Sequence, residues 1–125
     1  IEIRDAFIIN IAIDFEIIVL PELNNSEVLL ACIEQFQIYF QKENWQINQP
    51  IILRDLYILL DKIKGVQSVK NILIENKSGT TSGYSQYSYD IGGATQNQVI
   101  YPSLDPSIFE IKYPNQDIKG KVVPL

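Results

Sequence analysis

The sequence predicts an α+β fold in which two helices cover one face of a small, mainly antiparallel β-sheet. Three patterns predict it: an early apolar segment with a two-residue period, two segments with helical spacing of apolar side chains, and short β-type runs separated by prolines toward the end. A chain of 125 residues, 46% of them hydrophobic, is long enough to bury a core. The expected order is strand, helix, helix, strand, followed by a proline-punctuated, β-rich C-terminal arm.

The first predicted strand covers residues 7–20. Its even-numbered face carries Asn10, Asp14 and Glu16, so we expect that face to be at least partly solvated, and Pro21 to end the strand. Because the chain lacks an initiator methionine and begins close to this strand, we expect it to be a piece of a longer protein. The core face would carry Phe7, Ile9, Ile11, Ile13, Phe15, Ile17 and Val19.

The first predicted helix follows a group of polar side chains at residues 24–26. Asn24, Asn25 and Ser26 offer side-chain oxygens for an N-cap, and Glu27 places negative charge in the first turn. We expect the helix to continue to about Glu43. Its buried stripe would consist of Val28, Leu29, Cys32, Phe36, Tyr39 and Phe40.

The second predicted helix begins near Pro50, which suits a first turn, and Gly65 is expected to cap its C-terminal end. Its apolar surface is unusually broad, so this helix is either buried on two sides or in contact with a partner. Base rates favour burial. The expected core face is Leu53, Leu56, Tyr57, Leu60 and Ile63, and the apolar residues off that face are Ile51, Ile52, Ile58 and Leu59.

A second strand is predicted over residues 66–75, and a polar turn over residues 76–83. We therefore expect an α+β core at residues 1–83 and a β-rich arm at residues 84–125 within the same domain, adding edge strands or lying outside the core. The arm contains β-type runs at 99–101, 108–112 and 118–123. Its Tyr-Pro-x-x-Asp motif occurs at 101–105 and 113–117, and two similar turns are the favoured interpretation over a recognition repeat.

Composition excludes several classes of function. Histidine is absent, which rules out Ser-His-Asp and Cys-His catalysis and histidine-metal sites within this sequence. No calcium loop and no glycine-rich phosphate motif occurs, and Cys32 has no intrachain partner for a disulfide. A net charge of −5 argues against nucleic acid and anionic membranes as partners. We predict no catalytic residues, no cofactor, no metal, no small-molecule substrate and no enzyme.

Contact with a partner protein is the function that the composition favours. Tyr84, Tyr87 and Tyr89 lie among serine, glutamine and asparagine, and tyrosine offers a large amphipathic surface at a low entropy cost. The alternative is an exposed arm with ordinary surface tyrosines. The full set of candidate interface residues is Ile51, Ile58, Tyr84, Tyr87, Tyr89, Tyr101 and Tyr113.

Four blocks of the sequence carry a resemblance to a known family. They are WQINQPI (45–51), LLDKIKGVQSV (59–69), YSQYSYDIGGAT (84–95) and VIYPSLDPSIFEIKYPNQDIKGKVVPL (99–125). With these blocks the chain resembles the C-terminal end of the baseplate wedge protein of T-even-type, contractile-tailed bacteriophages whose dimers form the inner baseplate ring. It is similar, more distantly, to the J-type baseplate proteins of simpler phages and contractile injection machines.

The resemblance implies a structural virion protein that assembles in the host cytoplasm. It would form homodimers and contact other baseplate wedge proteins in a ring around the tail hub. Members of the family are several times longer, so this chain would correspond to their C-terminal domain. A different class remains open: strand-helix-helix-strand domains also resemble small regulatory modules that bind metabolites, and the Gly/Ser/Tyr loop would then close over a ligand.

Overall fold

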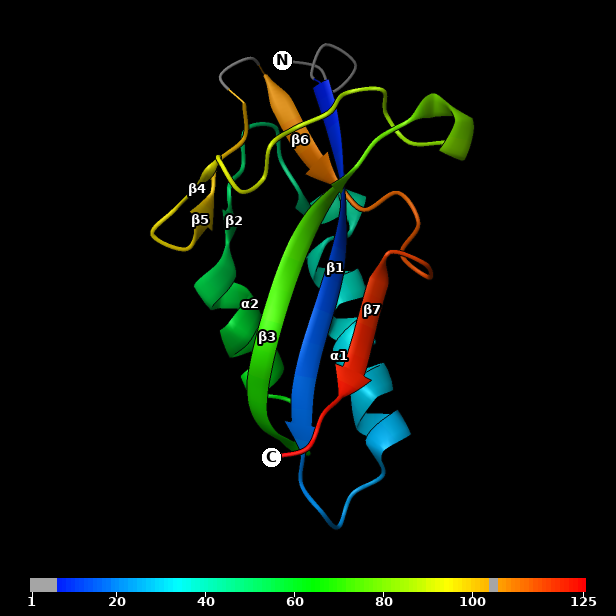
Figure 1. Cartoon of the computed structure of the whole chain (residues 1–125), viewed down its shortest axis with the longest axis vertical. Helices are drawn as coiled ribbons and strands as arrows, with labels where there is room; N and C mark the ends of the chain where they lie inside the picture. The colour runs from blue at the N-terminus through cyan, green and yellow to red at the C-terminus, as the bar shows by residue number, and fades with distance from the viewer. Residues whose placement is uncertain (1–6, 104–105) are drawn as a thin grey trace.

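The structure is a computed structural model, and it describes residues 7–103 and 106–125. Figure 1 shows an elongated molecule in which strand β1 runs through the centre along the long axis. The described elements, in chain order, are β1 (Phe7–Val19), α1 (Asn25–Tyr39), the 3₁₀ turn η2 (Lys42–Asn44), β2 (Ile51–Ile52), α2 (Leu53–Asp61), β3 (Val66–Lys77), the 3₁₀ turn η3 (Thr80–Ser82), β4 (Thr95–Gln96), β5 (Val99–Ile100), β6 (Ser107–Glu110) and β7 (Ile118–Val122).

Strand β1 is paired along both of its edges. On one edge β3 runs antiparallel to it over most of its length. On the other edge β6 and β7 both run parallel to β1, β6 beside its first residues and β7 beside its later ones (Figure 1). The main sheet is therefore mixed, and it differs from the expected mainly antiparallel sheet in the parallel pairing of β6 and β7 with β1. The chain between β3 and β6 is long enough to reach the other edge of β1. The loop of residues 111–117 then leads into β7, which runs in the same direction as β6.

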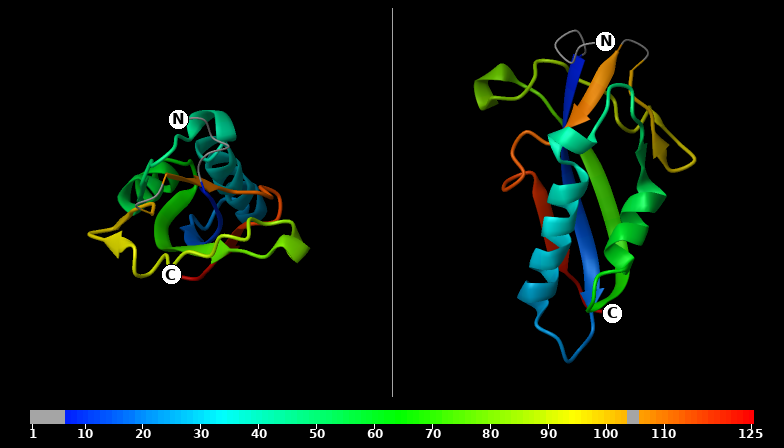
Figure 2. Two further views of the ribbon diagram at one scale, coloured as in Figure 1. Left: turned by 90° about the horizontal axis from the view of Figure 1, so that it is seen from above. Right: turned by 180° about the vertical axis from the view of Figure 1, so that it is seen from behind.

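Both α-helices of the described chain lie on one face of this sheet (Figure 2). The predicted two-residue period of β1 is confirmed, because the odd-numbered side chains from Ile9 to Ile17 are buried on the helix side. Phe15 meets Phe36 of α1 edge to face, with ring centroids 5.3 Å apart. The α+β class and the placement of the helices therefore follow from the periodicities in the sequence.

Helix α1 begins as expected and ends earlier than expected. The Asn24 Oδ1 atom accepts a hydrogen bond from the Glu27 amide at 3.1 Å, which is the predicted N-cap. The helix stops at Tyr39 rather than near Glu43. The Asn44 side chain donates to the Ile38 carbonyl at 3.1 Å and so satisfies a carbonyl at the helix end.

Helix α2 begins at Leu53, three residues after Pro50. The expected first turn is instead the short strand β2, in which Ile51 pairs with Ile100 and Ile52 with Val99 of β5 (Figure 1). The Leu53 amide donates to the Gln98 carbonyl at 2.9 Å. The broad apolar surface thus belongs to two elements, and Ile51 is buried by a second small sheet, of order β2-β5-β4.

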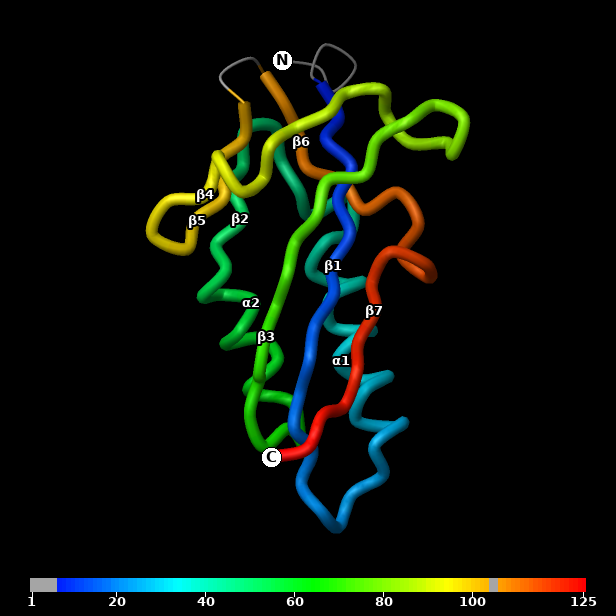
Figure 3. Tube along the Cα trace, in the orientation of Figure 1, coloured from blue at the N-terminus to red at the C-terminus, as the bar shows by residue number. Residues whose placement is uncertain are grey.

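The segment after residue 84 contributes to the core instead of lying outside it. Its predicted strands at 108–112 and 118–123 appear as β6 and β7, and Ile108, Phe109 and Ile118 are buried in the same cluster as β1 and the helices. The tube in Figure 3 shows β6 beside the beginning of β1 and β7 beside its later part, and both pair with β1. Of the two expected arrangements, edge strands or an arm outside the core, the structure therefore has edge strands.

The two Tyr-Pro-x-x-Asp copies can be compared only in part. In the second copy the amides of Gln116 and Asp117 both donate to the Tyr113 carbonyl, at 2.9 and 2.8 Å, which makes a tight turn before β7. The first copy ends at Asp105, which lies outside the described residues. Among the described helices, none is long and apolar enough to cross a membrane.

Candidate functional site

A strap of chain, defined here as residues 84–94, crosses the face of the sheet opposite the helices, near the beginning of β1 (Figure 1). Asn10 of β1 holds the start of the strap. Its Oδ1 atom accepts a hydrogen bond from the Ser85 amide at 2.7 Å, and its Nδ2 donates to Glu110 Oε1 at 2.9 Å. Only 1% of Asn10 is exposed, because the strap covers it, whereas Asp14 on the same face of β1 is exposed, so the expectation of a partly solvated face is confirmed.

Asn76 of β3 repeats this arrangement one strand away. Its side chain donates to the Asn10 carbonyl at 2.9 Å and accepts a hydrogen bond from the Tyr89 amide at 2.9 Å. Two asparagine side chains from neighbouring strands therefore replace the missing ladder hydrogen bonds of the strap backbone.

Tyr84 contacts a buried carboxylate at the end of the second proline turn. Its hydroxyl lies 3.0 and 2.8 Å from the two carboxylate oxygens of Asp117, which is 3% exposed. Burial, the hydrogen bond to Asp117 and the negative charge of Asp117 raise the pKa of Tyr84 to about 12. The ring also packs edge to face against Tyr113, at 5.3 Å, and the Tyr113 hydroxyl donates to the Ser82 carbonyl at 3.3 Å.

Tyr87 and Tyr89 are also used within the chain. The Tyr87 ring stacks on Phe7 at 4.7 Å with an interplanar angle of 13°. The Tyr89 hydroxyl donates to the Tyr101 carbonyl at 2.6 Å, and its ring lies 6.2 Å from Phe109. Burial first, and then the charges of Tyr87 and Asp90, raise the pKa of Tyr89. The tyrosines of the strap anchor it to the sheet. Only the exposed part of each half-buried tyrosine side chain is therefore available for contact with a partner.

The seven predicted interface residues do not form one surface. Ile51 is 0% exposed, so its assignment to an interface was wrong, because β2 buries it against β5. Ile58 on α2 is 45% exposed and Tyr101 after β5 is 48% exposed. Tyr84, Tyr87, Tyr89 and Tyr113 are half-buried.

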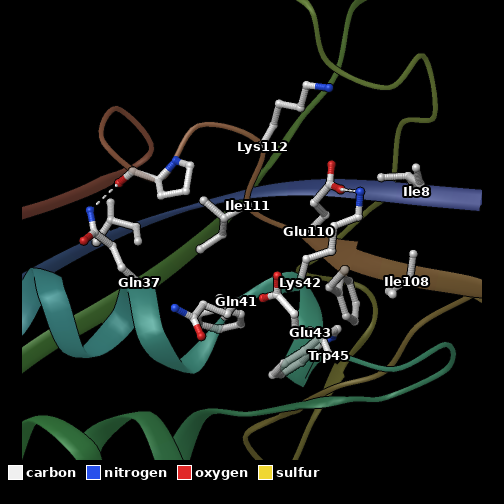
Figure 4. A pocket seen from close by; sticks show the side chains of 14 residues that line it. Ile8, Gln37, Gln41, Lys42, Glu43, Trp45, Ile108, Glu110, Ile111 and Lys112 are labelled. Atoms are coloured by element: carbon white, nitrogen blue, oxygen red, sulfur yellow. Dashed lines mark hydrogen bonds and ion pairs between the residues drawn. The ribbon is translucent and has the colours of Figure 1, made fainter.

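A cavity of about 360 Å³ lies where the end of α1 and the turn η2 face the outer edge of β6 (Figure 4). Its size is within the usual range of ligand pockets. Apolar and charged side chains share its wall. The lining residues are Ile8, Gln37, Phe40, Gln41, Lys42, Glu43, Trp45, Ile108, Phe109, Glu110, Ile111, Lys112, Pro114 and Ile118.

Trp45 is the unusual member of this wall. Its side chain is almost completely buried and packs against Phe40, with ring centroids 4.9 Å apart, and against Tyr39 at 5.7 Å. The indole Nε1–H has no hydrogen-bond partner among the described residues. A buried indole N–H normally finds an acceptor, so this donor calls for an explanation.

The charged groups of the wall balance one another. Lys42 Nζ lies 3.9 Å from Glu110 Oε2, and Glu43 and Lys112 are exposed at the rim. The Gln37 side chain donates to the Pro114 carbonyl at 3.2 Å and so ties α1 to the loop between β6 and β7. Two lysines and two glutamates therefore surround an apolar floor.

The described residues offer little for catalysis. Across residues 7–103 and 106–125, no group of three or more cysteine, aspartate or glutamate side chains could hold a metal ion. Cys32 is fully buried, and burial raises the pKa of its thiol to about 11, so the reactive thiolate is scarce at neutral pH. The arrangement can hold a hydrogen-bonding, apolar ligand, and it presents no nucleophile paired with a base.

The cavity was missed by sequence reasoning. The signal that points to it is the single tryptophan of the chain, at position 45, directly after the end of the apolar stripe of α1. The opposite wall of the cavity could not be inferred, because its residues come from β6, far away along the chain.

Compared with models of known protein families and with curated proteins, the chain matches none.

Proposed function

We propose that this chain is a structural subunit of a phage tail baseplate wedge, which associates with itself and with other wedge proteins in the ring around the tail hub. The observation that carries the proposal is the resemblance of the four long blocks to the C-terminal end of that family. In this proposal the strand, helix, helix, strand order is the scaffold, and residues 84–125 carry the assembly contacts. The protein would be located in the virion and assembled in the host cytoplasm.

Features of the described residues support an assembly role. Large apolar side chains are exposed at Ile58 of α2 and at Tyr101 after β5, both among the predicted interface residues. The strap is fixed to the sheet by hydrogen bonds at both of its asparagine anchors. A surface that is ordered before binding loses less conformational entropy when a partner docks on it.

Solution mass from light scattering across a concentration series tests the self-association. We expect a dimer that dissociates on dilution, and we expect Ile58→Asp and Tyr101→Ser to shift this equilibrium toward monomer. Leu30→Asp, on an exposed position outside the predicted interface, is the matched control. A monomer at every concentration would contradict self-association of this chain.

Deletion of residues 84–125 is unsuitable for this test. It would remove β6 and β7 from the main sheet, together with buried residues such as Phe109, so the shortened chain would lose part of its core. Point substitutions at exposed positions leave the sheet intact and report on the interface alone.

A second candidate function is the binding of a small molecule, and the cavity with the unpartnered Trp45 N–H favours it. A ligand that binds the folded state alone raises the melting temperature by mass action. A metabolite panel that leaves the melting temperature unchanged would count against this function.

A further inference from the structure

The helix layer, defined here as the outward faces of α1 and α2, is open on the side away from the sheet (Figure 2). The two helices lie side by side and run in opposite directions. A hollow between them is lined by Ala31, Glu34, Gln35, Leu59, Lys62 and Ile63. Glu34 and Lys62 therefore lie at about the same level along the helices, one on each wall of this hollow.

The charges at this level differ in sign between the two helices. Helix α1 contains two glutamates and no lysine or arginine. Glu34 is exposed in its middle, and Lys62 is exposed at the C-cap of α2. Neither side chain forms an ion pair within residues 7–103 and 106–125. Both charges are therefore available to groups that approach from outside.

Two large apolar side chains lie one turn away from these charges. Ile38 follows Glu34 by four residues, and Ile58 precedes Lys62 by four, so each isoleucine shares an exposed face with its charged neighbour. Ile38 is 50% exposed and Ile58 is 45% exposed. Because the helices are antiparallel, both steps lead in the same direction along the molecule. Ile38 and Ile58 therefore form an apolar level next to the charged level.

A two-fold axis that runs along the hollow, parallel to the helices, makes this pattern self-complementary. A half-turn about it places α1 of one copy over α2 of the other and keeps every residue at its own level. Glu34 then faces Lys62 of the second copy, Ile38 faces Ile58, and each contact occurs twice. An axis across the helices would instead place Glu34 over Glu34 and Lys62 over Lys62. Like charges in contact are unfavourable, so the charges select the first arrangement.

We propose that the helix layer binds a second copy of this chain across this two-fold axis, with Glu34 paired to Lys62 and Ile38 packed on Ile58 in both directions. The inference deepens the proposed self-association and rests on it, because it names the surface that the two copies share. The strap lies on the opposite face of the sheet, so it stays free for contacts with other wedge proteins (Figure 1).

The length of α2 limits the contact. This helix has 9 residues, which corresponds to about 13 Å at a rise of about 1.5 Å per residue. Leu30 lies one turn before Glu34, at a level beyond the end of α2, so no residue of the facing helix meets it. A contact of this length belongs to the small, weak class of interfaces, and we expect the dimer to dissociate on dilution.

Exchange of the two charges tests the pairing. In Glu34→Lys both contacts bring two positive charges together, and in Lys62→Glu both bring two negative charges together. We expect either variant alone to raise the dissociation constant of the dimer at least about tenfold in sedimentation equilibrium. A heterodimer of the two variants has opposite charges at both contacts. Mixing them should therefore restore the wild-type affinity, and native mass spectrometry should show the mixed species.

Matched controls make the same charge changes elsewhere. Glu75→Lys and Lys119→Glu alter exposed positions on the opposite face of the sheet, and we expect an unchanged dissociation constant. If a charge variant fails to fold, Ile38→Cys and Ile58→Cys ask the same question. Under mild oxidation a disulfide between copies should form in the mixture of these two variants and in neither variant alone.

The possible outcomes separate the surface from self-association itself. Wild-type dimers that persist in both charge variants would overturn this surface and leave self-association through another one. Charge variants that stay monomeric when mixed would overturn the pairing of Glu34 with Lys62. An equal loss of dimer in the controls would assign the effect to net charge and also overturn the pairing. A wild type that is monomeric at every concentration contradicts self-association, and the inference falls with it.

Discussion

Replacing Tyr84 by phenylalanine removes the hydroxyl that hydrogen-bonds to the buried carboxylate of Asp117. Both oxygens of Asp117 lie within 3.0 Å of that hydroxyl, and no other side chain donates to them among the described residues. A hydrogen bond to a charged group contributes about 1.5–3 kcal/mol, and loss of one partner leaves the other unsatisfied. Because Tyr84 is only half-buried, water can reach part of the site. We therefore expect the free energy of unfolding to fall by about 2 kcal/mol.

Urea denaturation measures this loss. With a typical m value of about 2 kcal/mol per molar, the unfolding midpoint of Tyr84→Phe should lie about 1 M below that of the wild type. Tyr101→Phe is the control, because the Tyr101 hydroxyl makes no hydrogen bond among the described residues and its loss should change stability by less than about 0.5 kcal/mol. An equal midpoint for wild type and Tyr84→Phe at neutral pH would refute the role assigned to this hydrogen bond.

The same variant has a defined pH dependence. The pKa of Tyr84 is raised to about 12 in the folded protein, against about 10 in an unfolded chain. The neutral hydroxyl is therefore favoured by folding, and its stabilisation is fully present below about pH 10 and is lost as the pH rises through about 12. The difference in midpoint between wild type and Tyr84→Phe should shrink over that range. A difference that stayed constant would contradict the raised pKa.

Three further substitutions or treatments test the fold and its anchors. Asn10→Ala leaves the Ser85 amide without its acceptor, so we expect a loss of about 1–3 kcal/mol and faster hydrogen exchange at Ser85 before global unfolding; slow exchange there would contradict the anchor. Gly120→Ala places a Cβ atom against the ring of Phe15, and overpacking of this kind should lower the free energy of unfolding by about 1–3 kcal/mol in urea titrations; an unchanged midpoint would show that the ring moves aside. Cys32 should react with a thiol reagent at pH 8 far more slowly in the native protein than in urea, because it is buried and its pKa is raised to about 11; equal rates would contradict this burial.

The elements whose signals are local were predictable from the sequence. The alternation of Ile9, Ile11 and Ile13 identified β1 and its core face, and the three N-cap candidates at residues 24–26 identified the start of α1. The β-type runs that became β6 and β7 were also identified, because proline and polar turns bound them on both sides.

The features that were missed depend on contacts between distant segments. The start of α2 was misplaced because Ile51 and Ile52 have a strand partner in β5, about fifty positions further along the chain. The role of Asn10 as an anchor was not foreseen, because the strap that covers it comes from another part of the chain. The cavity at Trp45 needs β6 and α1 together, so neither segment shows it alone.

The position of β1 between β3 on one side and β6 and β7 on the other has a consequence for the kinetics of folding. Strand β1 precedes β6 and β7 in the chain, so it acquires these neighbours only when residues 107–122 have also been synthesised. Such pairing between distant segments closes the largest loop in the molecule, and loops of this kind slow the folding of mixed sheets. Until then one long edge of an isoleucine-rich strand is open to other nascent chains, so the yield of folded protein depends on how quickly translation reaches β7.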